Sequence, residues 1–140
     1  TQAVRATFNR LRALGDQLHS DLEITTAMRA VMETLARSGA MTVPQIAKVK
    51  GVTRQHIQLL ADALCEAGLA SVKENPAHKR SSLIALTDTG RRAFAKMGAR
   101  EAPVIDEVAE SFGAEELDRA TGVLQRLSAR LDEAMKTGAT

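Results

Sequence analysis

Residues 46–57 read "IAKVKGVTRQHI", a stretch in which apolar residues at helical steps frame a glycine and the polar triplet "RQH". Ala47 is small enough to let two helices cross closely. Gly51, four positions later, tolerates the positive φ angle of a tight turn. Three apolar residues are expected to seal the two helices from below: Val52, Ile57 and Leu60. The spacing favours a helix-turn-helix, although an ordinary helical hairpin also uses Ala and Gly in this way.

The bulk composition is that of one compact, soluble domain. The 140 residues are 44% hydrophobic and 26% charged, which is typical of a folded chain. Aromatic residues make up only 2%, so we expect an aliphatic core and no stacking of bases on aromatic side chains. No apolar run would span a membrane and no signal peptide is recognisable. A single cysteine, Cys65, excludes an internal disulfide, and we therefore expect a cytoplasmic protein.

Positive charge gathers in the middle of the chain. Residues 42–92 contain eight basic and four acidic residues, a net charge of +4, whereas the formal net charge of the whole chain is +2. The flanking residues are therefore slightly acidic. A basic middle of this kind indicates contact with a polyanion, and on charge alone a solvated surface explains it equally well.

The apolar periodicity predicts six helices and one hairpin. The helices are expected at about residues 2–20, 24–38, 42–51, 53–68 and 87–113, with the last one after Gly113. Pro103 lies inside the fifth helix and is expected to bend it. The segments "LASVKE" and "SSLIALT" flank "NPAHKR", which predicts an antiparallel hairpin with a basic tip. This hairpin directly after the two short helices favours the winged helix-turn-helix over an ordinary helical hairpin.

The fourth helix has a polar face that suits the edges of DNA bases. With Ile57 and Leu64 turned inward, the outward positions are occupied by Gln55, Gln58, Leu59 and Asp62, flanked by Arg54 and His56. Arginine can pair with guanine and glutamine with adenine, while Leu59 could meet a thymine methyl group. Thr53 and the helix N-terminus could hold a phosphate oxygen. For any single residue, Gln58 for example, a plain solvent-facing role stays open.

Residues 74–90, "ENPAHKRSSLIALTDTG", resemble the wing and exit of MarR-family transcription regulators. The family pattern runs Asp-Pro-x-Asp-x-Arg, then a strand, then Leu-Thr-x-x-Gly. The order of elements also matches over nearly the whole chain. The resemblance implies a mainly α fold with a two-stranded β wing. It further implies a DNA-binding lobe over residues 22–89 and dimerisation helices over residues 1–21 and 90–140.

The same resemblance implies a homodimer that binds duplex DNA, and we expect it to act as a repressor. Arg80 would then be the wing arginine that enters the minor groove, supported by Lys79 and Ser81 at the backbone, with His78 beside them. The chain departs from the family pattern at Asn75 and His78, where aspartates are common. An aspartate can hold the wing arginine by a charge-assisted bond, which a neutral histidine does less well.

A small-molecule effector site is a further implication of the resemblance, in the region between the dimerisation helices and the DNA-binding lobe. The candidate residues are His19, Met28, Arg29 and Met32. The alternative, which we favour for both methionines, is that they belong to the core.

Other chemistries find less support. Cys65 could make the protein a redox-sensing regulator, but it lies beside the apolar face of a helix, where packing is the better interpretation. His and Cys residues show no metal-ligand spacing, and no nucleotide-binding or hydrolase motif is present. We therefore expect no cofactor, no metal and no enzymatic activity. A winged helix used as a protein-interaction module is the remaining alternative.

Overall fold

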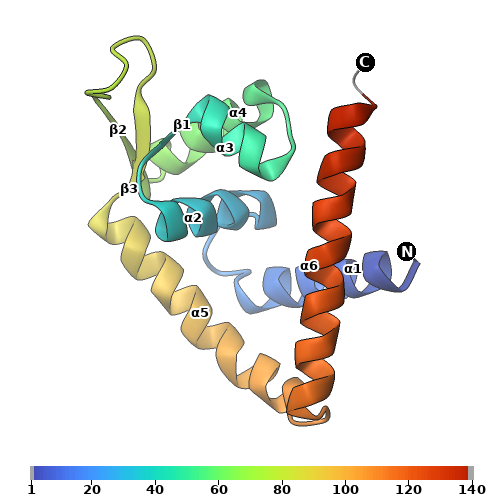
Figure 1. Cartoon of the computed structure of the whole chain (residues 1–140). Coiled ribbons are helices and arrows are strands. Elements are labelled where there is room, and N and C mark those ends of the chain that lie inside the picture. Colours follow the sequence, from blue (N-terminus) through green and yellow to red (C-terminus); the bar gives the residue numbers. More distant parts are fainter. Residues whose placement is uncertain (1, 139–140) are drawn as a thin grey trace. The chain divides into compact units, whose positions relative to one another are not determined.

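The computed structural model describes residues 2–138 and shows helices with one small antiparallel sheet (Figure 1). Along these residues the elements are α1 (Gln2–Leu18), α2 (Thr26–Ser38), β1 (Met41–Thr42), α3 (Val43–Lys50), α4 (Arg54–Glu66), β2 (Ala70–Lys73), β3 (Leu83–Leu86), α5 (Asp88–Ala109) and α6 (Ala114–Thr137). The predicted mainly α winged helix-turn-helix is confirmed. None of the helices within residues 2–138 has the length and apolar character needed to cross a membrane.

The chain divides into two compact units. The first ends at Glu101 and holds α1 to α4, the sheet and the N-terminal part of α5. The second begins at Ala102 and holds the remainder of α5, which continues through Pro103, and all of α6. Residues 22–89, the predicted DNA-binding lobe, lie wholly in the first unit.

The core of the first unit is aliphatic, as its composition predicts. Helix α2 packs against α1, α4 and β3. The largest apolar side chains that are fully buried are Val31, Met32, Ile46, Ile57 and Leu64. They come from α2, α3 and α4, so the three helices share one core and hold the outer face of α4 in a fixed place.

The turn between α3 and α4 follows the predicted local chemistry. Thr42 and Gln45 form a capping box at the start of α3, with hydrogen bonds of 3.3 and 2.9 Å. Gly51 ends α3 in the left-handed conformation, with φ 65° and ψ 34°. Thr53 caps α4 by accepting a hydrogen bond from the His56 N–H at 3.1 Å. These contacts fix where α4 begins and which of its faces points outward.

One expectation for this turn is wrong. Ile57 is buried and Leu60 is half-buried, but the Val52 side chain is 41% exposed and does not seal the two helices. Its backbone N–H closes the turn instead, by donating to the Ala47 carbonyl oxygen at 3.1 Å. The left-handed residue before Val52 places it in the bend, outside the helical face that packs inward.

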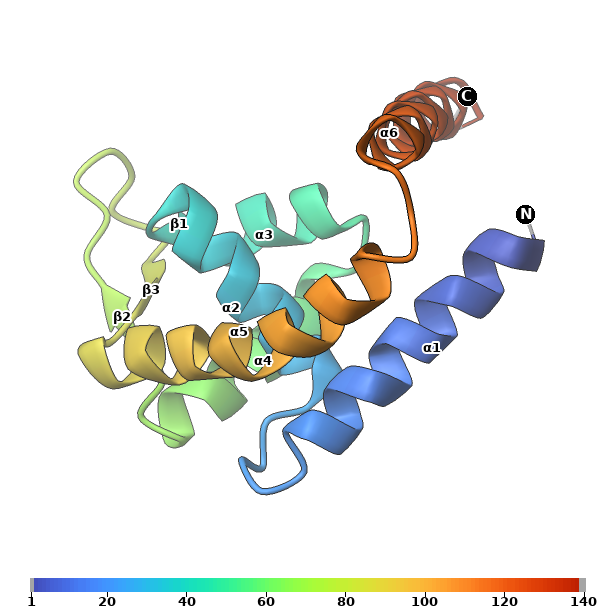
Figure 2. The same cartoon turned by 90° about the horizontal axis from the view of Figure 1, so that it is seen from below.

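The sheet has the order β1-β3-β2, with both pairs antiparallel. Strands β2 and β3 form the predicted wing, and their connecting loop extends away from the helices (Figures 1 and 2). The third strand, β1, was not expected from the sequence; it pairs Met41 with Ile84 immediately before the cap of α3. The base of the wing is thereby tied to the start of the helix-turn-helix.

The segment Leu86-Thr87-Asp88-Thr89-Gly90 locks the wing to α5. The Thr87 N–H donates to the Leu69 carbonyl oxygen at 3.1 Å, and the Thr87 hydroxyl donates to the Gly68 carbonyl oxygen at 2.7 Å. A Cβ atom on Gly90 would lie 1.9 Å from the Leu69 carbonyl oxygen. Only glycine allows this approach, which gives the Leu-Thr-x-x-Gly pattern a steric reason.

Candidate nucleic-acid interface

An open groove of about 470 Å³ lies between the start of α4 and the wing. Arg54 and Gln58 of α4 line it together with Arg80, Ser81 and Ser82 of the wing. Two arginines that are 26 positions apart in the chain therefore meet at one concave surface. A ligand seated in the groove could touch the first turns of the helix and the wing at the same time.

Both groove arginines are available to a ligand. Among the described residues 2–138, neither the Arg54 nor the Arg80 guanidinium is engaged in a hydrogen bond or ion pair, and both residues are exposed. Glu74, an acidic residue of the wing, makes no ion pair with Arg80 within the described part of the chain. Unpaired guanidinium groups in a concave, exposed site suit an anionic ligand such as a phosphate backbone.

The first turn of α4 adds a second feature that favours anions. Its N-terminal N–H groups carry partial positive charge, and Thr53 satisfies one of them through its side-chain oxygen. Arg54, Gln55 and His56 are all exposed here. Leu59, one turn further on, is 65% exposed, as its position on the outward face predicts.

The wing tip is shaped by its own backbone. The Asn75 side-chain oxygen accepts a hydrogen bond from the Ala77 N–H at 3.1 Å, and the Asn75 carbonyl oxygen accepts one from the His78 N–H at 3.2 Å. The Ser81 N–H then donates to the His78 carbonyl oxygen at 3.2 Å. Asn75 thus replaces the expected aspartate as the residue that organises the turn.

The structure brings together some of the predicted DNA-binding residues and leaves others apart. Arg54, Gln58, Arg80 and Ser81 share the groove. Lys79 lines a separate hollow of about 500 Å³ with Glu74 and Asn75. A small hollow of about 150 Å³ beside α2 takes in His56. The residues that are exposed but do not line the groove are Thr53, Gln55, Leu59 and His78.

The predicted effector residues lie mostly in the core. Met28 and Met32 are both buried and belong to the apolar cluster, in agreement with the alternative interpretation. His19 is only 2% exposed. Arg29, by contrast, lines a further hollow of about 440 Å³, whose walls include Phe8, Phe94 and Glu101. We name it the Phe8–Phe94 hollow.

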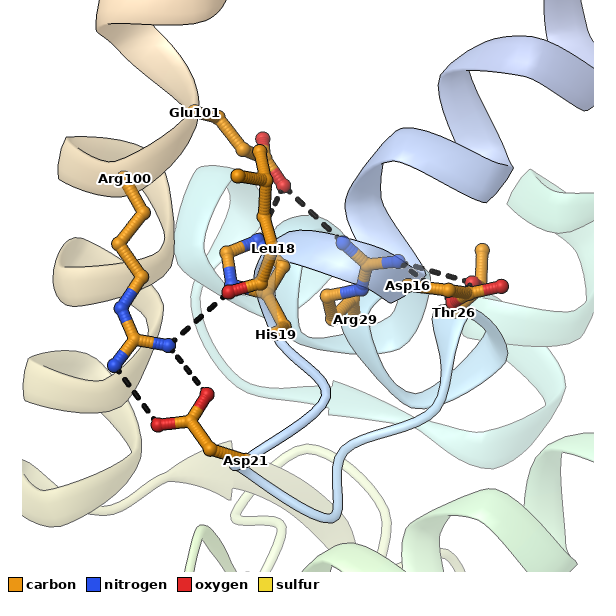
Figure 3. A network of polar contacts seen from close by, with 8 residues as sticks. All are labelled: Asp16, Leu18, His19, Asp21, Thr26, Arg29, Arg100 and Glu101. Atoms are coloured by element: carbon orange, nitrogen blue, oxygen red, sulfur yellow. Dashed lines mark hydrogen bonds and ion pairs between the residues drawn. The ribbon is translucent and has the colours of Figure 1, made fainter.

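Arg29 is the centre of a polar network that the sequence does not reveal (Figure 3). We use the name polar joint for Asp16, His19, Thr26, Arg29 and Glu101. The Arg29 guanidinium donates to Glu101 at 3.1 Å, to Asp16 at 3.1 Å and to Thr26 at 2.9 Å. His19 Nε2 lies 2.7 Å from the same Glu101 oxygen, while His19 Nδ1 is buried without a partner among the described residues. The joint connects α1, α2 and α5.

A neighbouring ion pair strengthens the same connection. The Arg100 guanidinium donates to both carboxylate oxygens of Asp21 at 2.6 and 3.0 Å, and to the Leu18 carbonyl oxygen at 3.2 Å. This bidentate contact holds the pKa of the Asp21 carboxyl below its usual value. No pattern in the sequence predicted the contacts that the Asp21 and Glu101 carboxylates make.

Gly15 is a position beside the polar joint where the sequence did hold a usable signal. A glycine inside an amphipathic helix lowers helix stability and often marks a close approach. A Cβ atom there would lie 2.3 Å from the nearest guanidinium nitrogen of Arg29. Gly15 is therefore the notch in α1 that admits the Arg29 side chain.

Cys65 does not have the surroundings of a redox sensor. It is half-buried, and its partial burial together with the nearby negative charge of Asp62 raises the pKa of the thiol. A raised pKa reduces the thiolate fraction, which is the reactive form. The packing interpretation is therefore favoured over the redox alternative.

Comparison with known sequences finds relatives of this chain but no matching family model. Uncharacterized proteins of Mycobacterium bovis and Mycobacterium tuberculosis are each 34% identical over 102 residues, which cover 73% of this chain and 71% of theirs.

Several solved structures share the fold of this chain. The chain is similar to a MarR family transcription regulator, with a TM-score of 0.84 and 26% identity over 96% of this chain and 89% of that one. A mutant MarR from E. coli complexed with operator DNA aligns with a TM-score of 0.80 and 20% identity over 90% of this chain and 91% of that one. BpsR of Bordetella bronchiseptica, whose DNA binding is regulated by 6-hydroxynicotinic acid, aligns with a TM-score of 0.77 and 21% identity over 91% of each chain.

Proposed function

Because the chain belongs to the MarR family of winged helix-turn-helix transcription regulators, we propose that it binds duplex DNA as a homodimer and represses transcription. Helix α4 would enter the major groove, where each base pair displays a distinct set of donors and acceptors. The wing would follow the adjacent backbone and insert Arg80 into the minor groove. No catalytic step is part of this proposal.

One observation carries the proposal: Arg54, Gln58 and Arg80 line the same groove. A recognition helix reads bases with its N-terminal residues, and Arg54 and Gln58 occupy the first and fifth positions of α4. Arg80 extends the same cationic surface onto the wing. A rigid duplex can touch both elements only if they face one side of the molecule, and a shared groove meets that requirement.

A second copy of the chain is the proposed partner of the outer helices. Large apolar side chains are exposed on α1 at Val4, Phe8 and Leu11, and on α6 at Leu117, Leu124, Leu127 and Leu131. The steps of seven, three and four along α6 suit packing against another helix. A two-fold dimer would place two copies of α4 in successive major grooves, about 34–36 Å apart, on a pseudo-palindromic site.

Selection of bound fragments from random duplex DNA tests the proposal directly. We expect enrichment of a pseudo-palindromic sequence by the full chain. We also expect affinity to fall by about a thousandfold or more between roughly 50 and 200 mM salt, because phosphate contacts release counterions. Retention of no duplex at low salt would contradict the proposal and would favour the protein-interaction module.

An organic acid is the proposed effector that releases DNA. The Phe8–Phe94 hollow combines apolar walls with the basic residues Arg12 and Lys50. Arg29, Glu33 and Glu101 also line it, and Arg29 is already paired with Glu101. BpsR, a structural neighbour, is regulated by such an acid. Lys50 is the last residue of α3, so a ligand in the hollow would contact the helix that precedes the turn.

The effector proposal has its own measurement. Small aromatic carboxylic acids should raise the melting temperature of the parent protein and weaken its DNA binding. Arg12→Ala should reduce both effects, whereas Arg10→Ala, on the same helix but outside the lining of the hollow, should not. An acid that shifts the two variants equally would exclude this hollow as its site.

A further inference from the structure

The outer face of α4 contains an internal hydrogen bond that bears on base recognition. Gln58 Nε2 donates to Asp62 Oδ1 at 2.8 Å, one helical turn further on. Within residues 2–138 this is the sole side-chain bond of either residue. An ionised carboxylate only accepts hydrogen bonds, so the nitrogen of the Gln58 amide must be the atom that faces Asp62. The chemistry of the pair therefore fixes which end of the amide is occupied.

This orientation changes what Gln58 can offer to a base. A free glutamine pairs with adenine by donating to N7 and accepting from N6. When Asp62 accepts from one N–H of the amide, it fixes the orientation of the group, so the side-chain oxygen and the second N–H are what remain for a base. In the major groove, cytosine N4 and adenine N6 are donors, whereas guanine presents the acceptors O6 and N7.

Resting on the DNA-binding function proposed above, we propose that Asp62 is a positioning residue that prevents the Gln58 amide from turning over. The amide oxygen is then presented to a base donor, which selects cytosine or adenine over guanine at one position. Gln58 lines the groove with Arg54 and Arg80, so its amide lies on the surface that would face the bases. Asp62 acts through this amide and does not itself line the groove.

The charge of Asp62 acts in the same direction. A carboxylate beside the contacted base repels guanine O6 and N7, which are themselves acceptors. Its field extends along the helix: after partial burial, the charge of Asp62 is the second cause that raises the pKa of the Cys65 thiol. Both the hydrogen bond and the charge therefore disfavour guanine.

Glu66 provides a matched control on the same helix. It is an exposed acid one turn beyond Asp62, and it has no side-chain bond within the described part of the chain. Glu66→Ala removes the same charge from α4 without touching Gln58. A general effect of negative charge on DNA affinity would appear in both variants, whereas an effect on base choice should appear only when Asp62 is changed.

The test is a comparison of base preference across variants of the full chain. Bound duplexes are first selected with the parent, and affinities are then measured on duplexes that carry each of the four bases at each selected position. For the parent we expect guanine to be disfavoured by about fivefold at one position, the size of effect that one hydrogen bond produces. Asp62→Ala should abolish this discrimination, and Glu66→Ala should retain it.

Two further variants separate positioning from a structural role. Asp62→Asn should keep most of the discrimination, because its side-chain oxygen still accepts from Gln58. In a Gln58→Ala background, removal of Asp62 should change base preference much less than in the parent, because only the effect of its charge is then lost. A role in helix stability alone would change affinity for all sequences alike.

The outcomes distinguish this inference from the function on which it rests. If the parent binds selected DNA but Asp62→Ala leaves its base preference unchanged, the inference is wrong and the proposed function stands. An equal change of preference on removing Asp62 with and without Gln58 would also overturn it. A parent that binds no duplex would overturn both.

Discussion

Arginines serve opposite purposes in the polar joint and in the groove. In the joint, the Arg29 side chain is 12% exposed and donates to Asp16, Thr26 and Glu101. In the groove, Arg54 and Arg80 are exposed and have no partner among the described residues. A guanidinium whose N–H groups are bonded to neighbouring helices stabilises the fold, whereas one whose N–H groups are unpaired can bind an anion.

The two sites also differ in the free energy that their arginines cost the folded protein. Arg29 is largely withdrawn from water, so its partners must compensate for lost hydration. The groove arginines stay hydrated until a ligand arrives, and their mutual repulsion is screened by salt. Substitutions in the joint should therefore change stability, and substitutions in the groove should change binding.

Arg29→Ala should have the largest effect on stability. It removes a largely buried cation and leaves the carboxylates of Asp16 and Glu101 without their main partner. We expect the free energy of unfolding to fall by about 2–3 kcal/mol, below the value for a fully buried pair because both acids are partly exposed. Denaturant titration at fixed protein concentration measures it. Arg37→Ala, which breaks an exposed pair with Glu33, should cost at most about 0.5 kcal/mol.

Arg80→Ala should show the reverse pattern. Loss of the wing cation should weaken DNA binding by about tenfold on most sequences, or about 1.4 kcal/mol, because the contact is to the backbone and minor groove. The melting temperature should stay close to that of the parent. Titration of a labelled duplex at moderate salt measures the affinity, and Arg37→Ala is the charge-matched control. Unchanged affinity for Arg80→Ala would show that the wing is wrongly assigned.

Gly15→Ala should destabilise the parent by about 1 kcal/mol. The added methyl group displaces the Arg29 guanidinium from its notch, although alanine is the better helix former. When Arg29 is already alanine, the same substitution should instead stabilise the protein by up to about 1 kcal/mol. A double-mutant cycle in denaturant reads out this change of sign. An equal loss of stability in both backgrounds would mean that Gly15 is not needed to make room for the Arg29 side chain.

Cys65 should give the smallest effect. Because its pKa is raised, the thiolate fraction at neutral pH is small and grows as the pH increases. Alkylation by iodoacetamide should therefore be slower than that of an unstructured cysteine peptide, and Cys65→Ser should leave DNA affinity unchanged. Loss of DNA binding after mild oxidation of the parent, but not of Cys65→Ser, would restore the redox alternative.

The elements that the sequence predicted well are those with local causes. The capping residues Thr42 and Thr53, and the left-handed Gly51, act on groups within a few positions of themselves. The six helices and the wing follow from apolar periodicity and turn residues in the same way. Val52 was misassigned because periodicity alone does not tell whether a residue in the bend points inward.

The candidate site was predicted in part. The outward face of α4 and the basic wing could be identified, but which of their residues share a groove depends on how β1 and β3 set the wing against α3. The spacing of four between Gln58 and Asp62 allows a bond between them, but the sequence alone does not show that the two side chains pair.

The sequence by itself determined the order of helices and strands, their caps and turns, and the polar face of α4, because each depends on residues a few positions apart. Only the tertiary structure decided that Arg29 would meet Glu101, 72 positions away, and that Arg54 would share a groove with Arg80. Contacts of that separation come from packing around one common core, and no local pattern in the chain specifies which side chains will then be neighbours.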